Sequence, residues 1–288
     1  MNIEKYILIT AAYNEAEFIE KTILSVVNQI IKPSEWIIVN DGSTDDTEDI
    51  VKTYKKQYPF IKLFSRIKES GRNFASKVFA INYGLKKIDL YKYNFIGILD
   101  ADVSFGPNYY SLLISKFINR PKLGVAGGIF FDMYNRKKVK VYPSPFSVRG
   151  ATQFFRLECF EQIGGLFPIK YGGEDGIACN AARMYGWEVG NFEDIEVLHH
   201  RPTGTVDRNI LKARFRDGFV EYHLGYHPLF QFVKCIRRIK EKPIFIGSIL
   251  RFFGFWWANL RREKRNISKE LISFIRKEQI GRLIKIDY

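Results

Sequence analysis

Two aspartates close an apolar segment near the middle of the chain. Residues 94–99 read Asn-Phe-Ile-Gly-Ile-Leu, and Asp100-Ala101-Asp102 follow directly. If the strand continues through them, side-chain alternation places Asp100 and Asp102 on the same side, so that both carboxylates can address one site. Two carboxylates beside a diphosphate form a hard-oxygen pocket for Mg²⁺ or Mn²⁺. Alternatively, the two aspartates lie in a solvated turn after a buried strand. Their spacing alone does not distinguish a metal site from such a turn.

The elements that would position these residues alternate between strand and helix. The first two hundred residues contain apolar, β-rich segments near 5–11, 35–40, 61–65, 94–99 and 123–131, with helical spacing at 17–30, 46–58 and 73–86. This βαβ series predicts an α/β domain with a mostly parallel sheet covered by helices. Polar residues follow the first two strands as well, and in open α/β sheets ligands bind at that edge.

Two common nucleotide-binding signatures are missing from the sequence. No glycine fingerprint of the dinucleotide-binding type follows the first strand, and no Gly-rich turn ends in Lys-Ser or Lys-Thr. A sugar nucleotidyltransferase, the enzymatic alternative, should show a Gly-rich phosphate loop near the N-terminus, and none occurs. The three cysteines, Cys159, Cys179 and Cys235, match neither a disulfide framework nor a zinc site, so we expect reduced thiols.

Taken together, the polar segments resemble family 2 glycosyltransferases of the GT-A fold, of the bacterial or archaeal polysaccharide or glycoconjugate type. The segments are Ala-Tyr-Asn-Glu at 12–15, Val-Asn-Asp-Gly-Ser-Thr-Asp-Asp-Thr at 39–47, Asp-Ala-Asp at 100–102, Arg-Gly-Ala at 149–151, Phe-Glu-Gln-Ile-Gly-Gly-Leu at 160–166, Gly-Glu-Asp at 173–175 and Leu-His-His-Arg at 198–201. The resemblance covers about residues 5–204. It implies a GT-A-like domain that moves a sugar from a nucleoside-diphosphate donor to a hydroxyl acceptor with a divalent metal, Mn²⁺ or Mg²⁺.

The resemblance also assigns donor-binding positions. Tyr13 and Glu15 lie where the family lines the nucleoside pocket, and Asp41 lies where a carboxylate meets the base. Arg72 and Lys77 precede a segment similar to the one whose basic residue approaches the diphosphate, and Lys77 is the better candidate of the two. Each residue also has a structural alternative: a helix N-terminal charge for Glu15, a turn former for Asp41, and helix-surface cations for the basic pair.

The catalytic and metal positions follow in the same way. Asp100 is assigned to the donor site and Asp102 to the metal. By the resemblance, Asp175 removes the proton from the acceptor hydroxyl in a single displacement that inverts configuration and needs no covalent intermediate. Some relatives place a further metal ligand at His199 or His200. Strand alternation favours His199, with His200 as the alternative. The structural alternatives are an N-cap for Asp175 and a hydrogen-bonded histidine pair at a strand end.

The chain changes character after residue 204. We expect a catalytic domain at 1–204 and a helical, basic and aromatic extension at 205–288, which carries 19 Lys+Arg against 8 Asp+Glu. Residues 243–260 are apolar and have basic clusters on both sides. As a helix, this stretch would be about 27 Å long, slightly short of a bilayer core. It better fits the interface of an anionic membrane. The alternative is that this helix packs on the catalytic domain or on a second subunit.

Partners and location are expected from the same features. The donor is a nucleotide sugar, with a UDP-sugar slightly favoured, and the acceptor is a glycan or a lipid-linked molecule. No nucleic-acid motif occurs, so we do not expect nucleic acid as a partner. The N-terminal residues lack a signal-peptide pattern, which predicts a cytoplasmic protein. The basic, aromatic extension predicts peripheral attachment at the inner face of the cell membrane. The non-enzymatic alternative is a membrane scaffold built on a degenerate transferase domain, and the presence of Asp102 and Asp175 argues against it.

Overall fold

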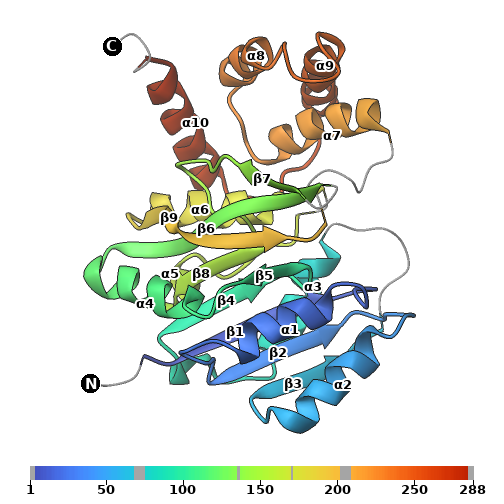
Figure 1. Ribbon diagram of the computed structural model, residues 1–288. Helices are drawn as coiled ribbons and strands as arrows, with labels where there is room; N and C mark the ends of the chain where they lie inside the picture. Colours follow the sequence, from blue (N-terminus) through green and yellow to red (C-terminus); the bar gives the residue numbers. More distant parts are fainter. Residues whose placement is uncertain (1–3, 68–74, 135–136, 170, 202–208, 285–288) are drawn as a thin grey trace. The chain divides into compact units, whose positions relative to one another are not determined.

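The computed structural model describes residues 4–67, 75–134, 137–169, 171–201 and 209–284. Within them the chain forms two compact units. One combines Met1–Pro168 with Glu174–Pro202, and the other combines Ile169–Gly173 with Thr203–Tyr288. The first unit is α/β and the second is helical (Figure 1). The domain boundary expected after residue 204 lies outside the described residues.

A single sheet organises the α/β unit. Its described strands are β1 (Tyr6–Ala12), β2 (Glu35–Asn40), β3 (Ile61–Ser65), β4 (Phe95–Leu99), β5 (Val103–Phe105), β6 (Leu123–Tyr134), β7 (Lys137–Val141), β8 (Thr152–Arg156) and β9 (Glu188–His199). They are ordered β3-β2-β1-β4-β8-β6-β9-β5, with β7 paired to β6. The first four neighbours are parallel, whereas β8 is antiparallel to β4 and to β6. The five predicted strands are all present, and the predicted α/β class is confirmed. The sheet is mixed rather than mostly parallel as predicted, because β8, β7 and β5 pair antiparallel with their neighbours, whereas β6 and β9 are parallel.

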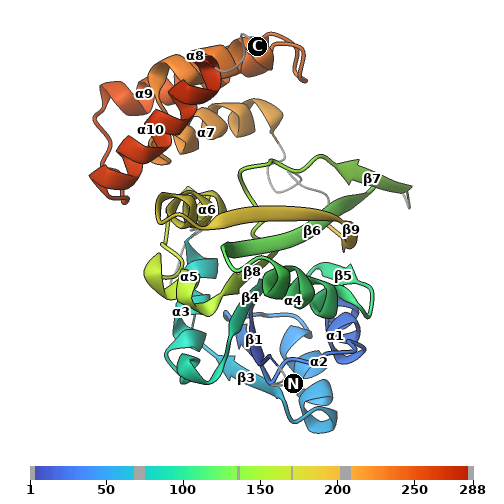
Figure 2. The ribbon, with the colours of Figure 1, turned by 90° about the vertical axis from the view of Figure 1, so that its left-hand side faces the viewer.

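Helices cover both faces of this sheet, as the parallel strands require, because strands of this kind are apolar on both sides. The helices are α1 (Ile19–Val27), α2 (Thr47–Gln57), α3 (Ser76–Leu85), α4 (Tyr109–Asn119), α5 (Leu157–Gln162) and α6 (Glu174–Met184). Figure 2 shows α1, α2 and α4 on one face and α3, α5 and α6 on the other. The three helices predicted between the first strands correspond to α1, α2 and α3.

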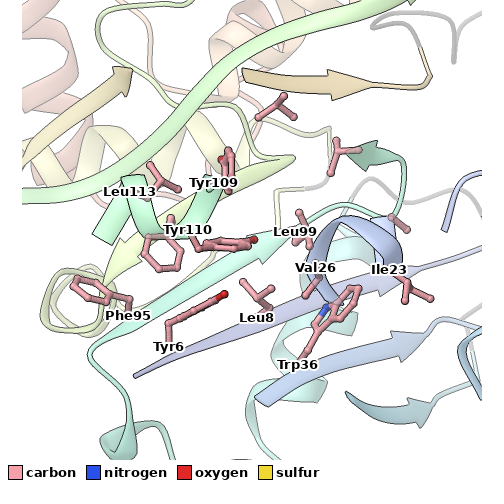
Figure 3. Close-up of a cluster of buried hydrophobic side chains, with 14 of the residues drawn as sticks. Tyr6, Leu8, Ile23, Val26, Trp36, Phe95, Leu99, Tyr109, Tyr110 and Leu113 are labelled. Carbon is pink, nitrogen blue, oxygen red and sulfur yellow. The ribbon is translucent and has the colours of Figure 1, made fainter. Parts of the chain in front are cut away.

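A large apolar cluster lies under α1 and α4 and fixes the strands against them (Figure 3). Tyr6 of β1 packs its ring 4.8 Å from that of Tyr110 on α4, and its hydroxyl donates to the Ile31 carbonyl oxygen at 2.7 Å. The buried Trp36 donates its indole N–H to the Thr10 hydroxyl at 2.9 Å. The polar atoms of Tyr6 and Trp36 are thus paired within the core.

The second unit consists of helices in close contact. They are α7 (Ile210–His223), α8 (Pro228–Arg237), α9 (Ile246–Leu260) and α10 (Lys269–Ile284), and α9 corresponds to the helix expected over 243–260. At Gly218 of α7 an added Cβ would overlap the Arg251 carbonyl oxygen, and at Gly254 of α9 it would overlap that of Phe215. Only glycine allows the two backbones to approach this closely. No described helix has both the length and the apolar composition needed to cross a bilayer.

A buried ion cluster ties three of these helices together. The Glu221 carboxylate on α7 accepts hydrogen bonds from Arg251 on α9, with Nε at 2.9 Å and Nη2 at 2.5 Å, and from the Lys234 ammonium on α8 at 2.6 Å. Burial would raise the pKa of Glu221, but the charges and hydrogen bonds of Lys234 and Arg251 outweigh it and lower the pKa to about 2. The helical unit therefore depends on an ionised Glu221.

We predict that Glu221→Gln lowers the free energy of unfolding at pH 7 by about 3–5 kcal/mol, because it leaves Arg251 and Lys234 without their buried counter-charge. Since the folded-state pKa lies below the unfolded value, this stability is present above pH 4.5 and is lost as the pH falls towards 2. Urea unfolding should show the gap between wild type and variant narrowing by about 2 kcal/mol between pH 7 and pH 3. The exposed Glu241→Gln serves as the control, and an equal loss in both variants would contradict the prediction.

Candidate active site

Five of the predicted site residues follow neighbouring parallel strands. β2, β1 and β4 lie side by side (Figure 1). Tyr13 and Glu15 follow β1, Asp41 follows β2, and Asp100 and Asp102 follow β4. Because parallel strands end at the same edge of a sheet, these side chains gather there although they are far apart in the sequence.

Asp100 and Asp102 lie in the turn between β4 and β5. β4 ends one residue before Asp100, and β5 begins one residue after Asp102. The prediction that strand alternation orients the pair is therefore wrong, because the backbone turns between them. The two carboxylates have different partners: Asp100 contacts Lys77, whereas Asp102 faces His199 and Arg201.

Lys77 links the Asp100 carboxylate to the loop before β8. Its ammonium lies 2.5 Å from Asp100 Oδ1 and donates to the Gly150 carbonyl oxygen at 3.3 Å. Burial alone would lower the pKa of Lys77, but the charges of Asp100 and Glu174 raise it above its usual value. Burial also raises the pKa of the Asp100 carboxyl against the opposing charge of Lys77. Lys77 is thus a fixed positive charge at the strand edge.

Asp41 is buried at the end of β2 and is held from two sides. Its Oδ1 lies 2.5 Å from Arg66 Nε, and its Oδ2 accepts a hydrogen bond from the Ser76 hydroxyl at 2.7 Å. Arg66 directly follows β3, and Ser76 is the first residue of α3. Both oxygens are therefore engaged within the protein, and a contact of Asp41 with a nucleobase stays a prediction.

Glu15 pairs with a residue from the far end of the α/β unit's sequence. Arg201 donates two hydrogen bonds to its carboxylate, from Nη1 at 2.9 Å and from Nη2 at 2.7 Å. The same guanidinium lies 3.7 Å from Asp102 Oδ2. Burial raises the pKa of Glu15 to about 7, and the hydrogen bonds and charge of Arg201 oppose that shift. Arg201 thus joins the turn after β1 to the turn after β4.

His199 lies between two carboxylates because β9 pairs with both β5 and β6. The register sets His199 opposite Val103 on one side and Asp132 on the other. Its Nδ1 is 3.0 Å from Asp132 Oδ1, and its Nε2 is 3.6 Å from Asp102 Oδ2. His200 points elsewhere: its Nε2 is 2.9 Å from the Ser104 hydroxyl, and its ring stacks on Phe18. Of the two predicted alternatives, the structure brings His199 to Asp102.

The charges of this cluster depend on one another. Burial lowers the pKa of His199, but hydrogen bonds and charges of Asp102 and Asp132 raise it above its usual value. Burial likewise raises the pKa of Asp102, and the hydrogen bond and charge of His199, with the charge of Arg201, bring it below its usual value. Two carboxylates facing one imidazole need a cation between them, either a proton on the ring or a metal ion.

Asp102 and His199 fit a divalent metal ion whose coordination is completed by a bound substrate. No three His, Cys, Asp or Glu side chains among the described residues converge as a complete metal site. Asp132 contacts Nδ1 of His199, which directs the other ring nitrogen towards Asp102, as carboxylates do for metal-bound histidines. Two atoms bound to one ion at about 2.1 Å lie roughly 3–3.5 Å apart, close to the Asp102–His199 separation of 3.6 Å. Mg²⁺ and Mn²⁺ sites commonly add substrate phosphates to one or two protein ligands.

Asp175 lies at the start of α6 beside a cavity of about 210 Å³. Its Oδ1 accepts from the Gly176 amide at 2.7 Å, and its Oδ2 accepts from the Gly150 amide at 3.1 Å. A Cβ on Gly150 would lie 3.0 Å from that of Asp175, so the glycine permits the approach. The cavity also contains Arg149 and polar groups from the loop after β7 and from β9. A hydroxyl compound in this cavity would meet the Asp175 carboxylate.

Tyr13 and Arg72 are the remaining residues predicted to bind the donor. Tyr13 stands in the turn after β1, where 43% of its surface is exposed. Arg72 lies outside the described residues. Their assignments to the nucleoside and diphosphate sites stay predictions.

Comparison with protein-family models identifies the family to which the chain belongs. The profile of Glycosyl transferase family 2 matches residues 7–172, more than half of the chain. The chain belongs to glycosyltransferase family 2. The suspected family is thereby confirmed, and the matched segment includes every predicted site residue except Asp175, His199 and His200.

Curated relatives of this glycosyltransferase match over a shorter segment. A poly-beta-1,6-N-acetyl-D-glucosamine synthase of Staphylococcus epidermidis is 31% identical over 126 residues, which cover 44% of this chain and 28% of the relative. The synthase of Staphylococcus aureus strain COL is 32% identical with the same coverage. The chain therefore matches less than a third of the length of these relatives.

Solved structures show the fold of the glycosyltransferase. The mannosyltransferase PcManGT from Pyrobaculum calidifontis, in complex with GDP-Man and Mn²⁺, has a TM-score of 0.58 at 18% identity, covering 99% of this chain and 81% of that one. S. aureus TarS 1–349 in complex with UDP-GlcNAc has a TM-score of 0.56 at 16% identity, covering 98% and 81%. At these identities the likeness establishes the fold alone, and it confirms the predicted GT-A fold.

Sequence reasoning missed three roles in this glycosyltransferase site. Arg66 and Arg201 each follow a strand that ends at the site, and their pairing with Asp41 and Glu15 depends on which strands are neighbours. Asp132 had a usable signal. It is an acidic residue within the apolar stretch 129–133, where a buried carboxylate requires a partner.

Proposed function

We propose that this glycosyltransferase transfers a sugar from a nucleoside-diphosphate donor to a hydroxyl acceptor, with a divalent metal and with inversion of configuration. The observation that carries the proposal is the convergence of Asp102 and His199, with Asp132 orienting the imidazole, at the strand edge where Lys77 supplies a positive charge. This combination of two metal-binding groups and a fixed cation matches the charge of a diphosphate.

In this proposal the donor occupies the ends of β1, β2 and β4. Tyr13, Glu15 and Asp41 line the nucleoside side, while Lys77 and Asp100 lie towards the diphosphate. Asp102 and His199 hold Mn²⁺ or Mg²⁺, which when bound neutralises the diphosphate and stabilises it as a leaving group. A UDP-sugar remains the favoured donor. Among the structural neighbours, TarS was solved with UDP-GlcNAc and PcManGT with GDP-Man.

The acceptor hydroxyl is proposed to enter the cavity beside Asp175. The Asp175 carboxylate takes the hydroxyl proton as the acceptor oxygen bonds to the anomeric carbon. The bond from that carbon to the diphosphate oxygen breaks on the opposite face, and its electron pair leaves with the diphosphate. The amides of Gly150 and Gly176 hold the carboxylate in one orientation. Lys77 stabilises the charge that develops on the leaving group.

We propose a glycan or lipid-linked acceptor in polysaccharide or glycoconjugate synthesis, because the matched relatives are named as poly-beta-1,6-N-acetyl-D-glucosamine synthases. We also propose a cytoplasmic protein with peripheral attachment at the inner face of the cell membrane.

We predict that Asp175→Asn lowers turnover by about 10²–10⁴-fold while donor binding is kept, because the amide cannot accept the proton. A panel of UDP-, GDP- and dTDP-sugars with Mn²⁺ identifies the donor, and turnover is then compared at saturating acceptor. Asp194→Asn, at an exposed position in the middle of β9 where the carboxylate pairs with Lys116, is the matched control and should keep its activity. Wild-type turnover of Asp175→Asn would assign the base to another residue, and a product with retained configuration would exclude the single displacement.

A second prediction concerns Asp132, which we propose as the residue that positions His199. Asp132→Ala should weaken Mn²⁺ binding in the presence of the donor's nucleoside diphosphate by about 10–100-fold, the usual cost of removing such a partner. Asp132→Asn should recover most of the affinity, because its amide oxygen still accepts from Nδ1–H. Asp102→Ala should abolish metal-dependent nucleotide binding.

Electron paramagnetic resonance of Mn²⁺ measures these affinities without turnover, and thermal melting checks that each variant is folded. Equal Mn²⁺ affinity of wild type and a folded Asp132→Ala would show that Asp132 has only a structural role. Unchanged metal-dependent binding in Asp102→Ala would remove Asp102 from the metal site.

A further inference from the structure

Apolar side chains are exposed along one side of α9. They recur every three or four residues and therefore form a stripe. The stripe consists of Ile246, Ile249, Phe253, Trp257 and Leu260, which are 48–76% exposed. The opposite side of α9 is buried and contains Gly254, which lies against α7. One side of the helix is thus fixed within the unit, and the other side presents large apolar groups to the surroundings.

The exposed surface continues onto α8 and the connection between the two helices. α8 exposes Leu229, Phe232 and Ile236, again three and four residues apart, and Ile244 and Phe245 precede α9. α8 and α9 lie next to each other (Figures 1 and 2). These ten residues, five on α9 and five before it, are called the α8–α9 face below. A contiguous apolar surface of this kind marks an interaction site.

A groove of about 400 Å³ opens on this face between the two helices. Phe232 and Ile236 line it from α8, Ile239 lines it from the segment after α8, and Ile249, Phe252 and Phe253 line it from α9. Aliphatic and aromatic groups thus form most of its wall. The groove therefore fits an apolar occupant such as a hydrocarbon chain.

Basic residues surround the α8–α9 face at both ends of α9. Residues 228–265 carry ten Lys or Arg and two Glu. Arg237, Lys240 and Lys242 are exposed before α9, and Arg261, Arg262 and Lys264 are exposed at its end or beyond it. The Arg261 guanidinium lies 4.5 Å from the centre of the Trp257 ring, which places a cation directly beside the apolar stripe. An apolar surface with a basic rim complements anionic headgroups above a hydrocarbon layer.

The charge pattern disfavours a second copy of the chain as the occupant. A twofold contact applies the same surface on both subunits, so it brings two basic rims together. Like charges in that position oppose association. An anionic lipid surface supplies the opposite charge and the apolar phase at once.

We propose that the α8–α9 face binds an anionic membrane, with α9 parallel to the surface and its stripe among the acyl chains. Because the other side of α9 packs on α7 through Gly218 and Gly254, only the stripe faces the lipid. The proposal deepens the peripheral location given above and rests on it, but not on the sugar-transfer chemistry. A vesicle-binding assay therefore tests the membrane proposal, and a turnover assay tests the sugar-transfer proposal, each without depending on the result of the other.

The test is sedimentation of the full chain with vesicles of equal parts phosphatidylglycerol and phosphatidylcholine, compared with phosphatidylcholine alone. The apparent partition coefficient should be at least about tenfold higher for the anionic vesicles, and it should fall by a similar factor between about 0.1 M and 0.5 M salt. Ile249→Glu/Phe253→Glu should lower it by about tenfold or more. The matched control, Ile30→Glu/Ile118→Glu, makes the same charge change at exposed positions of the α/β unit and should bind as wild type does.

A second variant covers the case in which the glutamates disturb folding. Arg261→Gln/Arg262→Gln/Lys264→Gln changes only exposed side chains and should also lower anionic-vesicle binding by about tenfold. The proposal is overturned if the wild-type chain does not sediment with anionic vesicles at low salt, or if both variants bind as wild type does. It is equally overturned if the wild-type chain is a dimer that ignores vesicles and Ile249→Glu/Phe253→Glu makes it monomeric, since a second copy then covers the face.

Discussion

The crowding of carboxylates at one edge of a sheet is the constraint on which the site depends. Asp41, Asp100, Asp102 and Asp132 are drawn together by strand order, and buried like charges are unstable unless each has a partner. Each has one: Arg66 for Asp41, Lys77 for Asp100, and His199 between Asp102 and Asp132. These cations come from other elements, so the pairs also fix α3 and β9 at the edge. One position, between Asp102 and His199, has the separation of two ligands on one ion.

The backbone of Gly150 connects the residue proposed to bind the diphosphate with the residue proposed as the base. Lys77 reaches the Gly150 carbonyl oxygen, and the Gly150 amide holds Asp175. A shift of this loop would therefore move both the cation proposed for the diphosphate and the base proposed for the acceptor. Gly150 has this position because a side chain there would press on Asp175. The donor side and the acceptor side are thus set by one backbone segment, which gives the proposed displacement a fixed geometry.

The sequence predicted the parts of the fold whose signal is local. The segments that became β1 to β4 and β6 were found because each is rich in apolar residues. By contrast, β8 has only Phe154 and Phe155 as apolar residues, and the three-residue β5 is too short to stand out. His199 was preferred over His200 from strand alternation, and the same rule failed at Asp100 and Asp102 because the backbone turns there. The pairings of Arg66 and Arg201 could not be predicted, since they depend on which distant strands become neighbours. Asp132 stands out in the sequence as an acidic residue in an apolar stretch, but its partner His199 follows only from the pairing of β6 with β9. The exposed face of α9 likewise requires knowing which side packs on α7.

We expect the carboxylate edge to be completed by a metal ion shared between Asp102, His199 and a diphosphate. The most direct measurement is an anomalous difference map from crystals grown with Mn²⁺ and UDP or GDP. A shared ion should give one strong Mn²⁺ peak at about 2.0–2.3 Å from the Asp102 carboxylate and from His199 Nε2, with diphosphate oxygens completing the coordination. A bound nucleotide with Mn²⁺ ligated by His200, or with no Mn²⁺ near Asp102, would contradict it.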